Sequence, residues 1–324
     1  MRRNLPVYIC EFLGTAIMLF IGISAVALMW APGSPMPVVP QPALRRLITG
    51  LLFAGGATLV VYSPLGQRSG GHINPAVTLA FWRLGKVPTR DAMAYVFAQF
   101  AGALAGTVAA GLAWRELTPA VQYAATTPGD GYPAWGALVA ETAITFLLVF
   151  TIFVCVNLPR VAPRTGLIAG ALVAVLVMIE APVSGTSLNP ARTLGPAIVV
   201  PLYRDVWLYV VGPCLGALLA VAAYSRQWGR TTVCAKLYHT EKYPCPFDQC
   251  GYRLAAAGET VMREGEPGDE AYVVERGALD VQLRRVTKQD FGRVLAHDPE
   301  RTEELLRQLA RRVKESSDRV AGRI

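Results

Sequence analysis

Charged residues are scarce over the first 225 residues of this chain, and most of those present lie in short connections between apolar stretches. From Arg226 onward, charged residues become frequent. Hydrophobic residues make up 53% of the 324-residue chain, and this average hides the change of character. A contrast of this kind predicts a membrane domain followed by a soluble tail.

The chain also lacks the sequence patterns of other functional classes. It shows no nucleophile–base constellation, phosphate-binding loop or catalytic metal motif, so we expect neither an enzyme nor a cofactor. The net charge is +8, but the basic residues form no stripe with interleaved aromatics. Basic flanks of membrane helices are therefore a simpler account than nucleic-acid binding. Six cysteines are spread over apolar segments and the tail, which does not predict a disulfide framework.

Six apolar stretches are long enough to span a bilayer. They are Pro6–Trp30, Leu47–Ser63, Ala92–Trp114, Ala134–Leu158, Thr165–Ala181 and Val206–Ser225. Lys and Arg are more numerous in the connections on the side of the N-terminus, which predicts that both termini are cytoplasmic. We expect a multi-pass protein of the plasma membrane, which in bacteria is the inner membrane.

One short motif occurs twice between these stretches. It reads Ser-Gly-Gly-His-Ile-Asn-Pro-Ala-Val-Thr over Ser69–Thr78 and Ser-Gly-Thr-Ser-Leu-Asn-Pro-Ala-Arg-Thr over Ser184–Thr193. Asn is a favoured helix N-cap, and Pro is tolerated in the first turn because its missing N–H would have no partner there. The apolar run after each motif is too short for another crossing. Each motif therefore predicts a loop that turns into a re-entrant half-helix.

The two halves of the membrane part match in the order of their features. An intramembrane glutamate opens each half, Glu11 in the first and Glu141 in the second, and the Asn-Pro-Ala follows. Three crossings per half is an odd number, so the halves must be inserted in opposite orientations. We expect an all-α membrane protein with six transmembrane helices and two re-entrant half-helices in an inverted repeat, followed by a small α+β cytoplasmic tail.

Inversion makes the two half-helices enter from opposite faces, so that their N-termini meet near the middle of the membrane. A helix N-terminus carries a partial positive charge, which repels cations and opposes proton passage while leaving neutral solutes alone. Asn74 and Asn189 can each present an N–H group to a passing oxygen, and Arg192 adds a full positive charge. The motifs thus predict a pore for water and small neutral solutes, formed by Asn74-Pro75-Ala76 and Asn189-Pro190-Ala191.

Three polar residues of the membrane part have two interpretations each. Glu11 and Glu141 fit a proton relay, because intramembrane carboxylates are functional candidates by default. Their equivalent positions favour structural support, in which each carboxylate accepts hydrogen bonds from the non-helical backbone before a half-helix. His72 fits a pH gate or, as we favour, a loop histidine with a hydrogen-bonding role.

At these motifs the chain resembles the aquaporin, or major intrinsic protein, family, and the resemblance extends from Arg2 to about Arg226. It implies homotetramers in a lipid bilayer, each subunit with its own pore. It also implies an outer selectivity constriction at four positions, which are Ala54, Val177, Thr186 and Arg192.

The chain departs from the strict water channels of that family at two of these positions. Those channels usually have an aromatic residue in place of Ala54 and a histidine in place of Val177. Glycerol-selective members usually have an aspartate where this chain has Thr193. We therefore expect a permissive pore that passes water and small neutral solutes such as glycerol, urea or undissociated metalloid acids.

The sequence after the channel domain (residues 1–228) divides into a linker (229–252) and a tail (253–324). Cys234, His239, Cys245 and Cys250 in the linker are spaced too loosely for a typical zinc site, and a solvated or lightly packed linker is the favoured alternative. The tail resembles a truncated cyclic-nucleotide-binding domain, with opening strands over 258–281. Its closing helix holds Leu305, Leu306, Leu309 and Val313 on one side.

The resemblance of the tail is incomplete where the ligand would bind. The strand near Arg285 passes almost directly to Asp290-Phe291, so the phosphate-binding cassette of that family is missing. Cyclic-nucleotide binding is therefore not expected, and the tail is interpreted as a scaffold or an oligomer contact. A channel gated by a ligand or partner bound to this tail is the alternative function. A proton-coupled transporter would need a mobile carboxylate at the pore.

Overall fold

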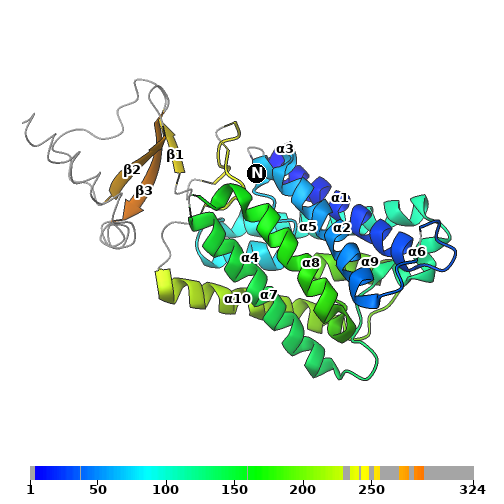
Figure 1. Ribbon diagram of the computed structural model, residues 1–324. Coiled ribbons are helices and arrows are strands. Elements are labelled where there is room, and N and C mark those ends of the chain that lie inside the picture. The colour runs from blue at the N-terminus through cyan, green and yellow to red at the C-terminus, as the bar shows by residue number, and fades with distance from the viewer. Residues whose placement is uncertain are drawn as a thin grey trace, which may run out of the picture. The chain divides into compact units, whose positions relative to one another are not determined.

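The computed structural model describes residues 4–36, 38–158, 160–228, 234–240 and 242–247, together with the backbone of three later strands. The chain forms two compact units, Met1–Cys250 and Gly251–Ile324, and each is described here by itself. Figure 1 shows the first as a bundle of helices and the second as a small sheet.

Six helices of the described chain are long and apolar enough to cross a membrane. They are α1 (Leu5–Trp30), α2 (Pro42–Tyr62), α5 (Thr89–Ala113), α7 (Ala134–Asn157), α8 (Thr165–Ser184) and α10 (Leu208–Trp228). The connections hold the short helical segments α3 (Pro64–Ser69), α6 (Leu117–Ala120), η2 (Gln122–Ala124) and η3 (Ala162–Arg164). Large apolar side chains remain exposed on all six long helices, as expected for surfaces that face lipid.

Two of these helices begin earlier than the apolar stretches predict, because polar contacts from distant parts of the chain extend them. α2 starts five residues early, at Pro42, and the Arg45 guanidinium in its first turns donates to the Met29 carbonyl. α5 starts at Thr89, and the carboxylate of Asp91 in its first turn is buried. Asn4 and Tyr8 both donate hydrogen bonds to that carboxylate.

Two shorter helices, α4 (Pro75–Arg83) and α9 (Pro190–Val199), begin at the repeated motifs. Each starts directly after its asparagine, with Pro at the first helical position. Together with the six spans, they confirm the predicted fold of six transmembrane helices and two re-entrant half-helices.

In each half, one pair of long helices packs closely at a glycine. α1 packs on α5, and α7 packs on α10, the last two lying side by side in Figure 1. At Gly102 of α5 an added Cβ would lie 2.2 Å from the Phe12 carbonyl oxygen of α1. At Gly216 of α10 it would lie 2.3 Å from the Thr142 carbonyl oxygen of α7. Only glycine permits backbones to approach this closely, as is common between membrane helices.

The second unit contains a three-stranded antiparallel sheet in the order β1-β3-β2. Its strands are β1 (Tyr252–Ala255), β2 (Glu270–Arg276) and β3 (Val281–Thr287). The register between β2 and β3 shifts at Val274/Arg276. Two features predicted for the tail, the passage to Asp290-Phe291 and the closing helix with Leu305, Leu306, Leu309 and Val313, lie outside the described residues.

The segment after α10 is more buried than the solvated or lightly packed linker that we expected. Its residues 234–247 belong to the first unit, and Cys234, Ala235 and Lys236 are each only 1% exposed. Lys236 is buried because backbone carbonyls surround its ammonium group. In the described part of the chain, no three His, Cys, Asp or Glu side chains are close enough together to hold a metal ion. Cys250 lies outside that part.

Candidate functional site: a cavity through the helical unit

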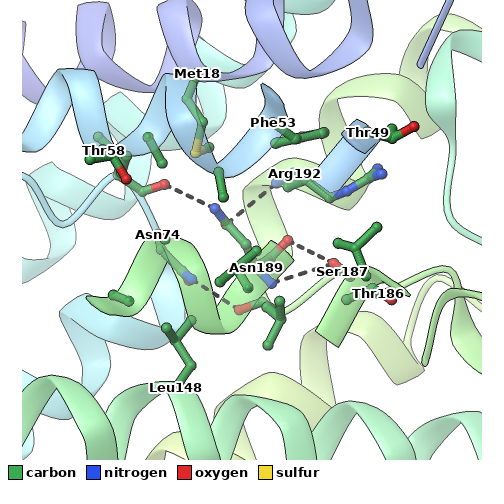
Figure 2. A pocket seen from close by; sticks show the side chains of 18 of the residues that line it. Met18, Thr49, Phe53, Thr58, Asn74, Leu148, Thr186, Ser187, Asn189 and Arg192 are labelled. Carbon is green, nitrogen blue, oxygen red and sulfur yellow. Dashed lines mark hydrogen bonds between the residues drawn. The ribbon is translucent and has the colours of Figure 1, made fainter. Parts of the chain in front are cut away.

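A cavity of about 490 Å³ lies inside the helical unit. One end is lined by Trp30 of α1 and Arg46 of α2, and we call it the filter-side end. The other is lined by Gly166 of α8 and by Leu237, and we call it the tail-side end. The N-termini of α4 and α9 meet between these ends. Figure 2 shows Asn74 and Asn189 in the middle of the cavity lining.

The two asparagines bind the backbone of each other's loop. Each side-chain oxygen caps its own half-helix: Asn74 Oδ1 accepts from Ala76 N at 2.8 Å, and Asn189 Oδ1 accepts from Ala191 N at 3.0 Å. Each amide nitrogen then reaches across the cavity. Asn74 Nδ2 donates to the Leu188 carbonyl at 2.9 Å, and Asn189 Nδ2 donates to the Ile73 carbonyl at 2.9 Å. The half-helices therefore meet end to end, as the inverted repeat predicts.

The residue before each asparagine has a strained backbone. Ile73 has a φ of 42° and Leu188 a φ of 58°, both in the left-handed region. A β-branched residue such as isoleucine is a genuine outlier there, and strain of this kind costs on the order of 1–3 kcal/mol per residue. This backbone turns the two carbonyls toward the opposite asparagine, so other contacts must hold it in place.

Those contacts come from the two buried glutamates. Glu11 accepts hydrogen bonds from Ile73 N at 2.7 Å and His72 N at 3.1 Å. Glu141 accepts equivalent bonds from Leu188 N at 2.8 Å and Ser187 N at 2.7 Å. Both carboxylates are 0% exposed. These are the hydrogen bonds expected of a carboxylate that supports the non-helical backbone.

Each glutamate also accepts side-chain hydrogen bonds. Ser69 and Ser184, at equivalent positions of the two motifs, each donate a hydroxyl hydrogen at 2.6 Å to Glu11 and Glu141 respectively. Gln99 of α5 donates a further bond to Glu11 at 2.8 Å. Both carboxylate oxygens of Glu11 and both of Glu141 accept hydrogen bonds, so the two groups are fixed acceptors behind the cavity wall.

All four residues of the expected constriction line the cavity: Ala54, Val177, Thr186 and Arg192. Arg192 is held by a hydrogen bond from Nη1 to the Ala124 carbonyl at 2.6 Å. Its guanidinium carbon also lies 5.2 Å from the centre of the Phe53 ring, which is within the range of a cation–π contact. Figure 2 shows Phe53 beside Arg192. An aromatic side chain thus stands next to the small Ala54.

Thr186 of this group is oriented by an acidic residue. Its hydroxyl donates to Glu180 Oε2 of α8 at 2.6 Å, and Glu180 is 7% exposed. Because the hydroxyl hydrogen is used by the carboxylate, Thr186 can offer only lone pairs to a solute. Arg192 supplies donors alone, so the two side chains offer complementary polar groups.

His72 is a hydrogen-bonding loop residue in this structure. Its Nδ1 lies 3.2 Å from Thr78 Oγ1, and its Nε2 lies 2.7 Å from the Ala235 carbonyl oxygen. The ring stacks on Phe81 with centroids 4.8 Å apart. The second contact was not expected, because Ala235 belongs to the segment predicted as a linker.

Several residues of the site were missed by sequence reasoning. Glu180 had a usable signal, since an acidic residue inside an apolar span marks a functional candidate. The sequence held no signal for Phe53 and Gln99, because aromatic and amide residues are common in membrane helices. Leu237 lies beyond the last span and was not considered for the pore.

The chain was compared with known proteins. The family model "Major intrinsic protein" matches residues 2–224. Aquaporin NIP1-3 from Oryza sativa subsp. japonica is 37% identical over 221 residues, covering 67% of this chain and 72% of the relative. Aquaporin AqpM from Methanothermobacter marburgensis is 36% identical over 237 residues, covering 67% of this chain and 94% of the relative.

One solved structure extends this comparison to the fold. The X-ray structure of the aquaglyceroporin from Plasmodium falciparum superimposes with a TM-score of 0.59 at 21% sequence identity. The match covers 69% of this chain and 96% of that one. At this identity the similarity shows the fold alone, and it agrees with the helical unit described above.

Proposed function

Because this chain belongs to the major intrinsic protein family and is a membrane channel for water and small solutes, we propose which solutes its pore passes and which it excludes. Proteins of this family are channels and not enzymes. The pore passes water and small neutral solutes such as glycerol, urea or undissociated metalloid acids. It excludes ions and protons.

The observation that carries this proposal is the end-to-end meeting of the two half-helices. The N-termini of α4 and α9 both point their partial positive charge at the same place, which disfavours a cation there. Each asparagine amide carries two hydrogens. Among the described residues, each amide donates one of these hydrogens to a carbonyl of the opposite loop. The other can bind the oxygen of water or of a polyol, whereas a metal cation gains nothing from such a donor.

The constriction supports a permissive rather than a strict water pore. Ala54 and Val177 contribute small apolar surfaces, and Thr186 and Arg192 contribute one acceptor and a set of donors. Such a lining suits a solute with hydroxyl groups on one side and carbon on the other. Phe53 lines the cavity beside Arg192, and we expect its ring to restrict the size of the solutes that pass.

We further propose a setting for the channel in the cell. The excess of Lys and Arg in the connections on the N-terminal side supports a cytoplasmic location of both termini. The plasma membrane, in bacteria the inner membrane, is the expected location. A homotetramer is typical of the family, and the exposed apolar side chains on the helices supply surface for both lipid and neighbouring subunits.

The experiment is stopped-flow light scattering on vesicles that contain the purified full-length protein. Water, glycerol and urea should all permeate faster than in protein-free vesicles, and a pH-sensitive dye inside should report no added proton leak. Arg192→Val should raise the urea and proton fluxes, because it removes a positive charge from the constriction. Arg204→Val, at a side chain 90% exposed, is the matched control and should change nothing. Vesicles that pass water but exclude glycerol and urea completely would refute the permissive pore.

A second candidate function, regulated opening, is favoured by one observation. Leu237, from the segment that follows α10, lines the tail-side end of the cavity.

A further inference from the structure

The chain carries a segment at the tail-side end of its own pore. We propose that the described residues 234–240 and 242–247, called here the plug segment, close the pore when docked and that conduction requires them to leave. The inference rests on the channel function proposed above. The matched family region ends at residue 224, so the plug segment lies beyond it.

Leu237 is the residue of the plug segment that blocks the path. Its side chain is 6% exposed and lines the same cavity as His72 and Gly166. Its backbone N–H donates to the Gly70 carbonyl at 3.0 Å, in the loop that leads to the first half-helix. This bond occupies one of the two lone pairs of that carbonyl, so one acceptor position fewer remains for a permeating solute. An apolar side chain at a narrow point also disfavours water, which is how hydrophobic constrictions gate.

Ala235, two residues before Leu237, connects the plug segment to the wall of the pore. Its carbonyl oxygen can only accept, so His72 Nε2 must carry the hydrogen of their 2.7 Å bond. Nδ1 of the neutral ring then accepts from the Thr78 hydroxyl, and Thr78 in turn accepts from Gln99 at 2.9 Å. Because Gln99 also donates to Glu11, docking engages the same hydrogen-bond network that supports the half-helix.

The fit at this contact is close. Gly70 has a φ of +106°, and a Cβ added there would lie 2.6 Å from the Ala235 carbonyl oxygen. Two aromatic contacts flank it: Tyr238 meets Tyr62 at 4.8 Å between ring centres, and Phe247 meets Tyr95 at 5.7 Å. Burial of residues 234–237 and Phe247, together with these contacts, distinguishes the plug segment from a chain that merely passes over the surface.

Lys236 anchors the plug segment. Its ammonium donates to the Gln67 carbonyl of α3 at 2.7 Å, and to the Tyr243 and Pro244 carbonyls at 2.6 Å and 3.1 Å. The first bond ties the segment to the channel, and the other two fold the segment back on itself. A buried ammonium is tolerated only when such acceptors surround it. When the segment leaves, only the bond to Gln67 has to break, and water can replace it; the two bonds within the segment can remain.

The test uses full-length protein in vesicles and two pairs of matched variants. Lys236→Met removes the anchor, and Arg115→Met removes a positive charge at an exposed position between α5 and α6, outside the plug segment. Leu237→Ala shortens the blocking side chain, and Leu219→Ala makes the same change at a leucine of α10 that is 53% exposed. Leu237→Ala retains the backbone hydrogen bonds and so remains informative even if Lys236→Met folds poorly.

Loss of hydrogen bonds to a charged group shifts an equilibrium by about tenfold or more. The water permeability of Lys236→Met should therefore be several-fold to about tenfold higher than that of the unmodified protein. The water permeability of Leu237→Ala should also be higher. Both controls should match the unmodified protein. Undocking has an independent readout: a maleimide should label Cys234, which is 1% exposed in the docked state, faster in Lys236→Met.

Two outcomes would overturn the inference, and they differ. If Cys234 becomes reactive while the permeability of both plug variants stays at the unmodified level, the segment undocks without opening anything. If the unmodified protein and every variant match protein-free vesicles, the channel function itself fails, and the plug fails with it.

Discussion

The two buried glutamates allow a quantitative prediction, because the geometry ranks them. In Glu11→Gln the new NH2 group must replace one of the carboxylate oxygens. Within the described chain, Glu11 Oε1 accepts from Ser69 and His72, and Oε2 accepts from Ile73 and Gln99. Whichever oxygen is replaced, two donors lose their acceptor and face another donor.

Glu141 is less constrained. Its Oε1 accepts from Ser184 and Ser187, and its Oε2 accepts from Leu188 alone. The amide of Glu141→Gln can therefore take the Oε2 position and leave a single donor unsatisfied. A buried unsatisfied donor costs about 1–3 kcal/mol, so we expect losses of roughly 2–6 kcal/mol for Glu11→Gln and roughly 1–3 kcal/mol for Glu141→Gln.

The assay is unfolding of the purified protein in mixed detergent micelles, followed by helix content as sodium dodecyl sulfate is added. Glu116→Gln, at an exposed position between α5 and α6, is the control and should unfold like the unmodified protein. The order of stability should be control, Glu141→Gln, Glu11→Gln. If both buried variants unfold with the control, the carboxylates do not hold the strained loops. If Glu141→Gln is less stable than Glu11→Gln, the number of donors that lose their acceptor does not determine the loss of stability.

Two further predictions concern packing and pH. Gly216→Ala should destabilise by about 1–3 kcal/mol because its Cβ would meet the Thr142 carbonyl. Gly55→Ala, with open space at its Cβ, should gain up to about 1 kcal/mol in the same unfolding assay. Burial and the Lys236 ammonium lower the pKa of His239 to about 4, so the docked plug segment holds this histidine neutral. The undocked side chain takes up a proton below its ordinary pKa of about 6.5, so docking weakens as pH falls from there toward 4. Water permeability should rise on the order of tenfold between pH 7 and pH 5, and His239→Gln should remove this rise; a flat profile in the unmodified protein would contradict it.

Much of the membrane fold could be predicted because lipid leaves few options. Long apolar runs must be helices, and an odd number of crossings per half forces an inverted repeat. The same reasoning placed a carboxylate behind each half-helix, since the backbone at Ile73 and Leu188 has no other partners in a membrane. These features follow from local sequence and from the solvent, so no long-range contact had to be known.

Features that depend on long-range contacts could not be predicted. The early starts of α2 and α5 depend on Met29, Asn4 and Tyr8, which are distant in sequence. The plug segment carries two lysines and a histidine, a composition typical of a solvated chain. Lys236 is buried nevertheless, because carbonyl groups offer it acceptors, and every residue has a carbonyl. The composition of the segment therefore does not predict that Lys236 is buried.

The exchange of hydrogen bonds between the asparagines also bears on biogenesis. When the first half of the chain has left the ribosome, the Asn74 amide and the Ile73 carbonyl still lack the partners that Leu188 and Asn189 will supply. Neither half can complete its own re-entrant loop. The conduit is therefore finished only after the second motif has been made, and the first half of the membrane domain forms no complete conduit by itself.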